Sequence, residues 1–424
     1  MNFCSKLSFR YISASSSTVK NQEQYLLYGY RQCAITIMKM IASSITAAMI
    51  AISLGRKLAF EWNIAYDFYP ASPSSTETMN AIVYHQHGNA SVLQYQRVPR
   101  PKIRPNQVLI QVYASSINPC DFKFRRNSMA KFLLPKPKIP GEDVAGVIVQ
   151  VGSQASAISS KQEETWKVGD RIVAMLPILG SRWGAAAEFV AVDAKSIARI
   201  GPSTSFEHAA SVPLVSLTVL QALLRVEPPY QDKKILVQAG AGGVGSFAIQ
   251  YAKHCLRMGV VATTASSKKH KYLKDLGADI LIDYTTEDFT KLIEDFDIVL
   301  DPMSWAYEKK TFESKVLKSR SGHYLNLLSS DWGFHGGWER SNGWLTLWNM
   351  IKSSITGYCC RYSFITVVPN GRQLQNVMDL LEKGTIRAVI DRQYNLSEAR
   401  QAYEYLEEGR ATGKVVLRHA RADE

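Results

Sequence analysis

The clearest chemical signal in this chain is a glycine loop set between an apolar stretch and an amphipathic one. The stretch ILVQAGAGGVGSFAIQ contains Gly240, Gly242 and Gly245, which fit G-x-G-x-x-G. In this pattern the first glycine permits a tight turn, the second lets the backbone approach a pyrophosphate, and the third lets helix and strand pack closely. Gly243 and Val244 begin the expected helix, where free amides and the helix dipole favour negative charge. The loop is therefore predicted to bind a dinucleotide.

The residues after the next expected strand bear on the choice of cofactor. A site that prefers NAD usually places Asp or Glu about 20 residues beyond the glycine loop, where it holds the ribose 2′-hydroxyl. Ala265 stands there, so that carboxylate is missing. Ser266, Ser267, Lys268 and Lys269 instead offer hydroxyls and cationic groups to a 2′-phosphate. We therefore expect NADPH rather than NADH, with a solvated helix start as the alternative role of the lysines.

The elements that must position these groups change in character along the chain. Residues 81–192 hold short, alternating strand patterns with Gly and Pro between them, which favour a partly open barrel. Residues 206–224 have a helical period, and from residue 235 strand and helix alternate, which predicts a parallel, doubly wound sheet. The tail returns to helix (residues 372–383), strand, helix (397–407) and a final strand (413–418). The fold class is therefore expected to be α/β.

Further motifs follow one another in a set order from residue 79 to residue 418. They are SINPCDFKFR at 116–125, IPGEDVAGVIVQVG at 139–152, VGDRIVAM from 168, GAAAEFVAV from 184, HAASVPLVSLTVLQAL from 208, LGADILIDY at 276–284 and ATGKVVL at 411–417. With the glycine loop, this set resembles the medium-chain dehydrogenase/reductase superfamily, in its zinc-free quinone oxidoreductase branch. Within it the chain resembles plastid-envelope quinone oxidoreductase homologues, alkenal/enone reductases and reticulon-interacting mitochondrial proteins.

The resemblance implies a domain organisation that agrees with the strand and helix patterns. A GroES-like, partly open β-barrel domain is formed by the first part of the fold and by the tail, and a Rossmann domain is inserted between them. The expected boundaries are a targeting segment and linker at 1–78, the first part of the GroES-like domain at 79–206, the Rossmann NADPH-binding domain at 207–369, and the return to the GroES-like domain at 370–424.

The resemblance also implies where hydride transfer takes place. The nicotinamide is expected between the two domains, with Asn118, Asp121, Lys123 and Thr218 nearest to it. Lys123 occupies the Lys of a D-x-K motif, where a cation would stabilise the anion formed as hydride arrives. A structural ion pair between Lys123 and Asp121 is the alternative, and Asn118 could instead satisfy backbone groups before Pro119.

Two further residues are implied as cofactor contacts. Tyr284, after the strand that follows the serine–lysine segment, would reach the 2′-phosphate. Lys414, in the Gly413-Lys414 pair, would approach the cofactor, with a solvated strand end as its alternative position.

Metal chemistry is not expected. Zinc-dependent relatives carry a Cys where Asn118 stands and a Gly-His-Glu where this chain has Gly141-Glu142-Asp143. The four-cysteine structural lobe is absent from the sequence as well. A zinc site needs about four well-placed N, S or O donors, which the sequence does not supply. His208 begins a helix, which favours a cap or surface role.

The substrate is expected to be a quinone or an α,β-unsaturated carbonyl. Trp183, Trp305, Tyr307 and the aromatic-rich residues 332–348 either line an apolar substrate site or form ordinary packing. The sequence shows no Ser or Tyr proton donor, so water could complete protonation. A second class of function remains open, in which the chain is an NADPH-binding, membrane-associated scaffold with little or no turnover.

The ends and the composition suggest where the protein acts. Residues 1–20 are rich in Ser and basic residues without an acid, which is typical of an organelle transit peptide, so a mitochondrion or plastid is expected. Residues 34–54 are apolar and long enough for a membrane span, a cleaved leader or an ordinary helix. The net charge of +13 comes without a basic, aromatic-interleaved stripe, so no nucleic acid partner is expected. Six cysteines without C-x-x-C indicate a reduced compartment, and a homodimer is possible by resemblance.

Overall fold

The structure is a computed structural model that describes residues 77–126, 136–155, 165–178, 183–303, 306–327 and 360–419. The chain divides into two units, Met1–Ser74 and Ser75–Glu424, and every described residue belongs to the second. The expected leader, the apolar residues 34–54, Trp305 and residues 332–348 lie outside the described residues. Within the described ranges, no helix has both the length and the apolar character needed to cross a bilayer.

A six-stranded, fully parallel sheet carries the glycine loop. Its order is β10-β9-β8-β11-β12-β13, so the chain moves outward from β8 in one direction and then returns to β11 on its other side. The loop follows β8 and therefore lies at the point where the strand order reverses, the place where such sheets bind ligands. The strands are β8 (Lys234–Val237), β9 (Val260–Thr264), β10 (Ile280–Ile282), β11 (Ile298–Asp301), β12 (His323–Leu327) and β13 (Arg361–Ile365).

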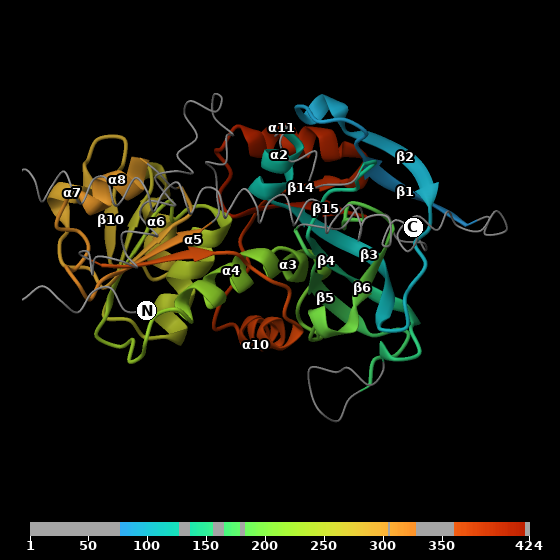
Figure 1. The fold of residues 1–424 in the computed structure, drawn as a ribbon, viewed down its shortest axis with the longest axis horizontal. Coiled ribbons are helices and arrows are strands. Elements are labelled where there is room, and N and C mark those ends of the chain that lie inside the picture. The colour runs from blue at the N-terminus through green and yellow to red at the C-terminus, as the bar shows by residue number, and fades with distance from the viewer. Residues whose placement is uncertain are drawn as a thin grey trace, which may run out of the picture. The chain divides into compact units, whose positions relative to one another are not determined.

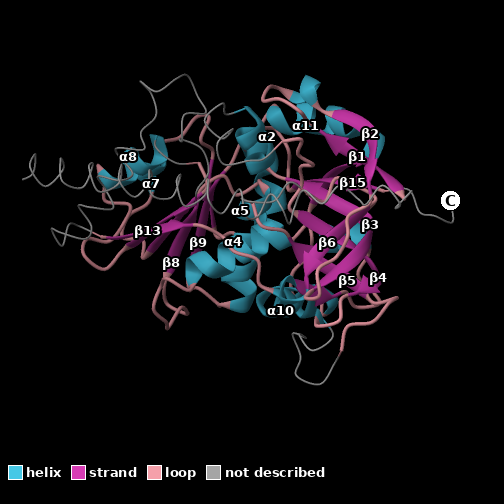
Figure 2. Ribbon diagram, turned by 45° about the vertical axis from the view of Figure 1, so that its right-hand side comes forward, coloured by secondary structure: helices cyan, strands magenta, loops and turns pink. Residues whose placement is uncertain are grey.

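Both faces of this sheet are covered because its strands are apolar on both sides. Ile235 and Val237 pack in the core that contains the residues of α4 and α5, while Leu236 packs in a second core with Phe289 of α7. Helices α4 and α5 lie between the parallel sheet and the antiparallel one in both views (Figures 1 and 2). The helices of this part are α4 (Pro213–Leu223), α5 (Gly243–Gln250), α6 (His270–Asp275), α7 (Phe289–Leu292) and α8 (Ala306–Phe312).

The second sheet is the GroES-like part, drawn mainly in teal and green in Figure 1. Its order is β14-β15-β3-β4-β5-β7, with β6 on β3, and every pairing except β14–β15 is antiparallel. Because β15 pairs with β3, the tail returns to the first part of the fold. The strands are β3 (Gln107–Ile117), β4 (Asp143–Val151), β5 (Arg171–Met175), β6 (Phe189–Asp193), β7 (Ile197–Arg199), β14 (Ile390–Asn395) and β15 (Lys414–Arg418).

Short elements close the ends of this second sheet. The hairpin of β1 (Thr78–Val83) and β2 (Gln94–Pro99) packs with α11 (Ala399–Glu407) in one apolar core. Helix α2 (Pro119–Arg126) follows β3 directly, and its buried Arg125 pairs with Glu407 of α11. Helix α3 (Phe206–Ala210) precedes α4, and α10 (Gly371–Glu382) leads to β14. The expected α/β fold with a GroES-like sheet and a Rossmann sheet is therefore confirmed.

Candidate active site

The glycine loop leaves the start of α5 open to a ligand. The residue before α5 is Gly242, which has no side chain to cap the first amides of the helix. A Cβ on Gly240 would overlap Thr263 Oγ1, and one on Gly245 would lie 2.5 Å from the carbonyl oxygen of Ala239. The turn itself differs from expectation, because the left-handed residue is Ala239, with φ of 52°, and not Gly240. Gly240 and Gly245 are needed for space within the loop.

The residues predicted for the 2′-phosphate gather at the ends of β9 and β10. Ser266 and Ser267 follow β9, and Tyr284, which is 55% exposed, follows β10. Lys269 Nζ donates to the carbonyl oxygen of Arg410, 3.1 Å away, in the turn that leads to β15. The structure thus brings the predicted hydroxyl and cationic groups to one edge of the sheet.

A carboxylate that the sequence analysis did not assign organises this edge. Asp283 Oδ2 accepts the amide of Ser267 at 3.0 Å, and Oδ1 accepts the amide and hydroxyl of Thr285 at 3.0 and 2.6 Å. These hydrogen bonds from Thr285 and Ser267 hold the pKa of Asp283 well below its usual range. The carboxylate of Asp283 therefore holds these two loops together. In the sequence, the position of Asp283 directly before Tyr284 is the signal that could have indicated this role.

Asn118 directly follows β3 and belongs to a buried polar cluster. Its side chain is 1% exposed, and its Nδ2 donates to Asp143 Oδ2 at 2.8 Å. Its Oδ1 accepts a hydrogen bond from the ammonium of Lys414. The orientation of the carboxamide follows from this contact, because an ammonium can only donate. Asn118 therefore bonds side chains of β4 and β15 and does not serve the backbone before Pro119.

Asp143 is the hub of this cluster, although the sequence analysis gave it no role. Its Oδ2 also accepts from Ser116 Oγ at 2.7 Å and from Lys414 Nζ at 3.0 Å. Its Oδ1 accepts the amide of Leu214 at 2.7 Å, in the first turn of α4. A carboxylate at a helix start is stabilised by the free amides and the helix dipole. The signal in the sequence was the acid that ends the GED motif, since the interpretation of that motif concerned metal ligands alone.

Asp121 and Lys123 lie on α2, directly after the Asn118 turn. The two carboxylate oxygens of Asp121 accept amides from Asn118 at 2.7 Å and Gly141 at 3.0 Å. Lys123 is half-buried two residues further on, and helical residues two apart do not face each other. This geometry gives Asp121 a role in holding the turn. The two alternatives for Lys123 stay predictions.

Thr218 lies one helical turn beyond Leu214 on α4. Its hydroxyl donates to the Leu214 carbonyl oxygen at 2.7 Å, and the residue is buried. Because that proton is engaged, the lone pairs of the hydroxyl remain free to accept a hydrogen bond. The hub Asp143 therefore fixes both Asn118 and the helix that carries Thr218.

A further set of buried charges lies next to this cluster. Burial and the nearby carboxylate of Asp121 raise the pKa of Glu142 well above its usual value. Burial lowers the pKa of Lys138, although Glu142 opposes that shift. Burial and Glu142 raise the pKa of the Cys120 thiol, whose sulfur lies 3.6 Å from Glu142 Oε2. These groups adjoin the Asn118 turn and were not assigned from the sequence.

Other predicted residues lie elsewhere. Trp183 packs against the core of β1 and α11, and Tyr307 stacks on Phe289. His208 lies exposed in the first turn of α3, where Ser205 Oγ accepts its amide at 3.2 Å. Among the described side chains, no group of three or more His, Cys, Asp or Glu is arranged to hold a metal ion.

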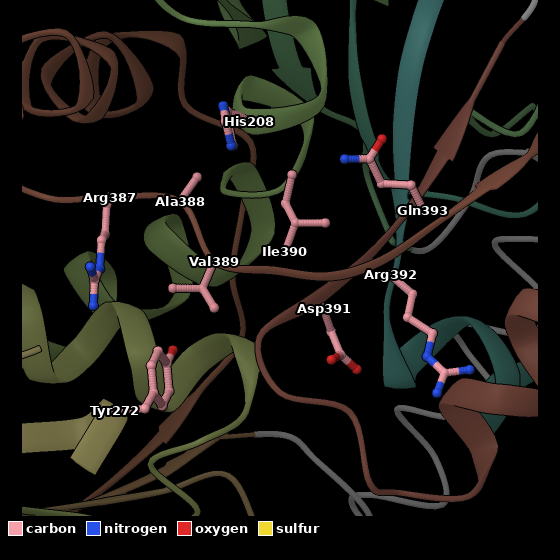
Figure 3. Close-up of a pocket in the computed structure, with 9 residues that line it drawn as sticks. All are labelled: His208, Tyr272, Arg387, Ala388, Val389, Ile390, Asp391, Arg392 and Gln393. Atoms are coloured by element: carbon pink, nitrogen blue, oxygen red, sulfur yellow. The ribbon is translucent and has the colours of Figure 1, made fainter. Parts of the chain in front are cut away.

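A groove of about 480 Å³ opens between α3, α6 and the segment that leads into β14 (Figure 3). It is lined by His208, Tyr272 and residues 387–393. None of the residues predicted for cofactor or substrate lines it. The carbonyl oxygen of Val389, one of the lining residues, accepts the amide of Lys414 at 2.9 Å, so the groove lies next to the strand that carries Lys414.

A parallel sheet with its glycine loop at the switch point, joined to a GroES-like sheet, defines a dinucleotide-dependent oxidoreductase. Family profiles agree, since "Zinc-binding dehydrogenase" matches residues 276–417 and "Alcohol dehydrogenase GroES-like domain" matches residues 104–202. The chain belongs to the medium-chain dehydrogenase/reductase superfamily, in the branch of the quinone oxidoreductases and alkenal/one reductases. It is therefore an NAD(P)H-dependent oxidoreductase by family, as its sequence motifs predicted.

Particular relatives support this placement. The 2-methylene-furan-3-one reductase of Solanum lycopersicum is 34% identical over 82% of this chain and 80% of its own length. The chloroplastic NADPH-dependent alkenal/one oxidoreductase of Arabidopsis thaliana is 33% identical over 82% and 81%. The solved quinone oxidoreductase of Coxiella burnetii has a TM-score of 0.69 and 30% identity, covering 81% of this chain and 100% of that one.

Proposed function

We propose that this chain is an NADPH-dependent reductase that transfers hydride to a quinone or an α,β-unsaturated carbonyl without zinc. The observation that carries the proposal is the composition of the edge at β9 and β10. Ser266, Ser267 and Lys269 follow β9, Tyr284 follows the neighbouring β10, and Ala265 stands where an NAD site would have its carboxylate. The relatives named for NADPH-dependent alkenal reduction and for quinone reduction support the same reaction type.

The glycine loop fits the pyrophosphate of such a cofactor. A Cβ on Gly242 would meet only the Ala239 carbonyl oxygen at 3.5 Å, so the space above Gly242 is open to a ligand. The amides of Gly243, Val244 and Gly245 begin α5 and have no partner within the helix. These residues would hold the phosphates, while Thr218 and the Gly413-Lys414 pair would border the nicotinamide end.

The bound cofactor supplies the hydride, so this chain's residues are left to orient, exclude water and balance charge. Lys123 would stabilise the negative oxygen that develops on the enone or quinone. Asn118 and Thr218, both fixed through Asp143, would set the position of the ring and the substrate. We propose that solvent supplies the proton.

The Asn118 cluster supports a zinc-free site. It already contains a cation, because the Lys414 ammonium is held by Asn118 and Asp143. An ammonium in that place meets the charge of the buried carboxylate without a metal ion. We therefore propose that Lys414 fills an electrostatic role that would otherwise call for a bound cation.

Stopped-flow oxidation of NADPH with a panel of quinones and enals tests the proposal. We expect turnover with at least one class and a preference for NADPH over NADH of tenfold or more. Lys123→Met should lower kcat 10- to 100-fold with little change in the KM for NADPH, while Lys271→Met on α6 serves as the matched control. NADPH binding without oxidation by any substrate would overturn the proposal and favour the scaffold function.

We also propose where the protein is located and how it assembles. Residues 1–20 and the chloroplastic name of the Arabidopsis relative support import into an organelle, a mitochondrion or plastid. Membrane association through residues 34–54 stays a prediction, because these residues lie outside the described ranges. Strand β13 ends the parallel sheet and, among described strands, pairs only with β12, which leaves an edge for a homodimer. Light scattering on the purified chain would measure that state.

A further inference from the structure

We propose that Lys414 is a positioning residue, which clamps the Asn118 turn and the first turn of α4 to the glycine loop. The inference rests on the proposed function. It specifies how the phosphate-binding loop is joined to the residues expected nearest the nicotinamide. In this arrangement the ammonium of Lys414 faces the protein interior, and its effect on the reaction passes through Asn118 and Asp143.

The backbone next to Lys414 is pinned to the glycine loop. The amide of Gly413 donates to the carbonyl oxygen of Ala241 at 2.8 Å, and Gly413 forms a bridge with Gly242. Gly413 has a φ of +82°, and a Cβ there would overlap the carbonyl oxygen of Val389. Only glycine fits this position without strain, so Lys414 leaves the loop at a fixed point.

The stem of Lys414 then crosses the start of α5. A Cβ on Gly243 would lie 2.7 Å from Lys414 Cδ and 3.3 Å from its Cγ. Gly243 is not one of the three glycines of G-x-G-x-x-G, so the cofactor pattern does not require it. Its lack of a side chain is explained by the lysine that passes over it.

The ammonium of Lys414 lies in a buried cluster. Lys414 is 5% exposed, and its partners Asp143 and Asn118 are 0% and 1% exposed. Asp143 binds Lys414, Asn118, Ser116 and the first turn of α4 at once. Removal of the ammonium would leave a buried carboxylate without its counter-charge and Asn118 Oδ1 without a donor.

One chain of contacts therefore runs from the phosphate-binding loop to the residues nearest the nicotinamide. It passes from Ala241 through Gly413 and Lys414 to Asn118 and Asp143, and from Asp143 to α4. A lysine used in this way should affect how the ring and substrate are oriented more than how tightly the dinucleotide is held.

The test compares Lys414→Met with Arg418→Met, which removes the same charge from the exposed end of the same strand. NADPH binding is measured by cofactor fluorescence, and kcat at saturating NADPH by stopped flow. We expect Lys414→Met to lower kcat at least tenfold while the Kd for NADPH changes less than threefold, and Arg418→Met to change neither. A Kd that weakens as much as kcat/KM, with kcat retained, would show that Lys414 binds the cofactor directly.

A thermal double-mutant cycle tests the clamp even where turnover is absent, which separates it from the proposed function. The Tm loss of Lys414→Met/Asn118→Ala should be several degrees smaller than the sum of the single losses, whereas additive losses would overturn the clamp. If Lys414→Met does not fold, Gly243→Ala displaces the stem and keeps the charge. It should lower kcat more than it weakens NADPH binding, and the reverse order would contradict the proposal.

Discussion

Replacing Lys269 with Met should change the choice between the two nicotinamide cofactors. The ammonium lies at the edge where Ser266, Ser267 and Tyr284 meet, within hydrogen-bonding distance of the Arg410 carbonyl oxygen. At about 4 Å from a phosphate charge, a cation contributes from ~1 kcal/mol in water to ~4 kcal/mol near a protein surface. Lys269 is half-buried, so we take ~1.4 kcal/mol, which is about tenfold in Kd.

The assay is cofactor fluorescence with NADPH and NADH, at low and high salt. Lys269→Met should weaken NADPH about tenfold and NADH less than twofold, and the NADPH effect should shrink with salt because the site borders solvent. Lys271→Met, an exposed cation on α6, is the matched control and should change the NADPH-to-NADH ratio less than twofold. Equal weakening of both cofactors by Lys269→Met would refute the assignment of this edge to a 2′-phosphate.

Two further predictions concern the loop and the response to acid. Gly240→Ala should lower the free energy of unfolding by about 1–3 kcal/mol, because its Cβ overlaps Thr263, while Gly242→Ala should change it less than ~1 kcal/mol yet weaken NADPH at least tenfold. Denaturant titrations and cofactor binding would measure both, and equal stability losses would contradict the steric reasoning. Burial lowers the pKa of His323 to about 4 and of His419 to about 3, so the unfolded chain binds these protons from pH 6.5 downward while the folded chain does not. The contribution of each histidine to the free energy of unfolding should be present in full above pH 6.5 and should fall toward pH 4 by up to ~1.4 kcal/mol per pH unit. His323→Asn should reduce this dependence of the unfolding free energy on pH, whereas His85→Asn, at an exposed position, should not.

Much of the fold followed from the sequence because its signals are local. Alternation of strand and helix after residue 235 predicted the parallel sheet, and each expected strand from β8 to β12 is present. The return of the tail could not come from local pattern, since the pairing of β15 with β3 joins residues about 300 positions apart in sequence. The resemblance to a known family supplied that expectation, and in the structure β15 lies beside β3.

The site was predictable in part for a similar reason. The glycines and the serine–lysine segment lie in one strand–loop–helix sequence, so spacing alone indicates that they share an edge. The role of Asp283 could not be predicted from spacing, because it depends on two loops that come together only in the folded sheet. Glu142 and Lys138 were missed because their altered pKa values come from burial, which a motif does not report.

Asp143 shows most clearly what the sequence leaves unsaid. The GED motif indicates the lack of a zinc ligand, because Glu142 stands in place of His, but the motif does not indicate what the acid after Glu142 binds. Yet a buried carboxylate is costly unless it is paired and hydrogen-bonded, and Asp143 meets that requirement with Lys414, Asn118, Ser116 and the start of α4. These partners come from four segments, so the same carboxylate that must be neutralised also fixes the relative positions of the segments. The contacts that neutralise the buried carboxylate of Asp143 are the same contacts that orient the Asn118 turn. A substitution that removes the need to neutralise this charge should therefore also disturb the orientation of the turn.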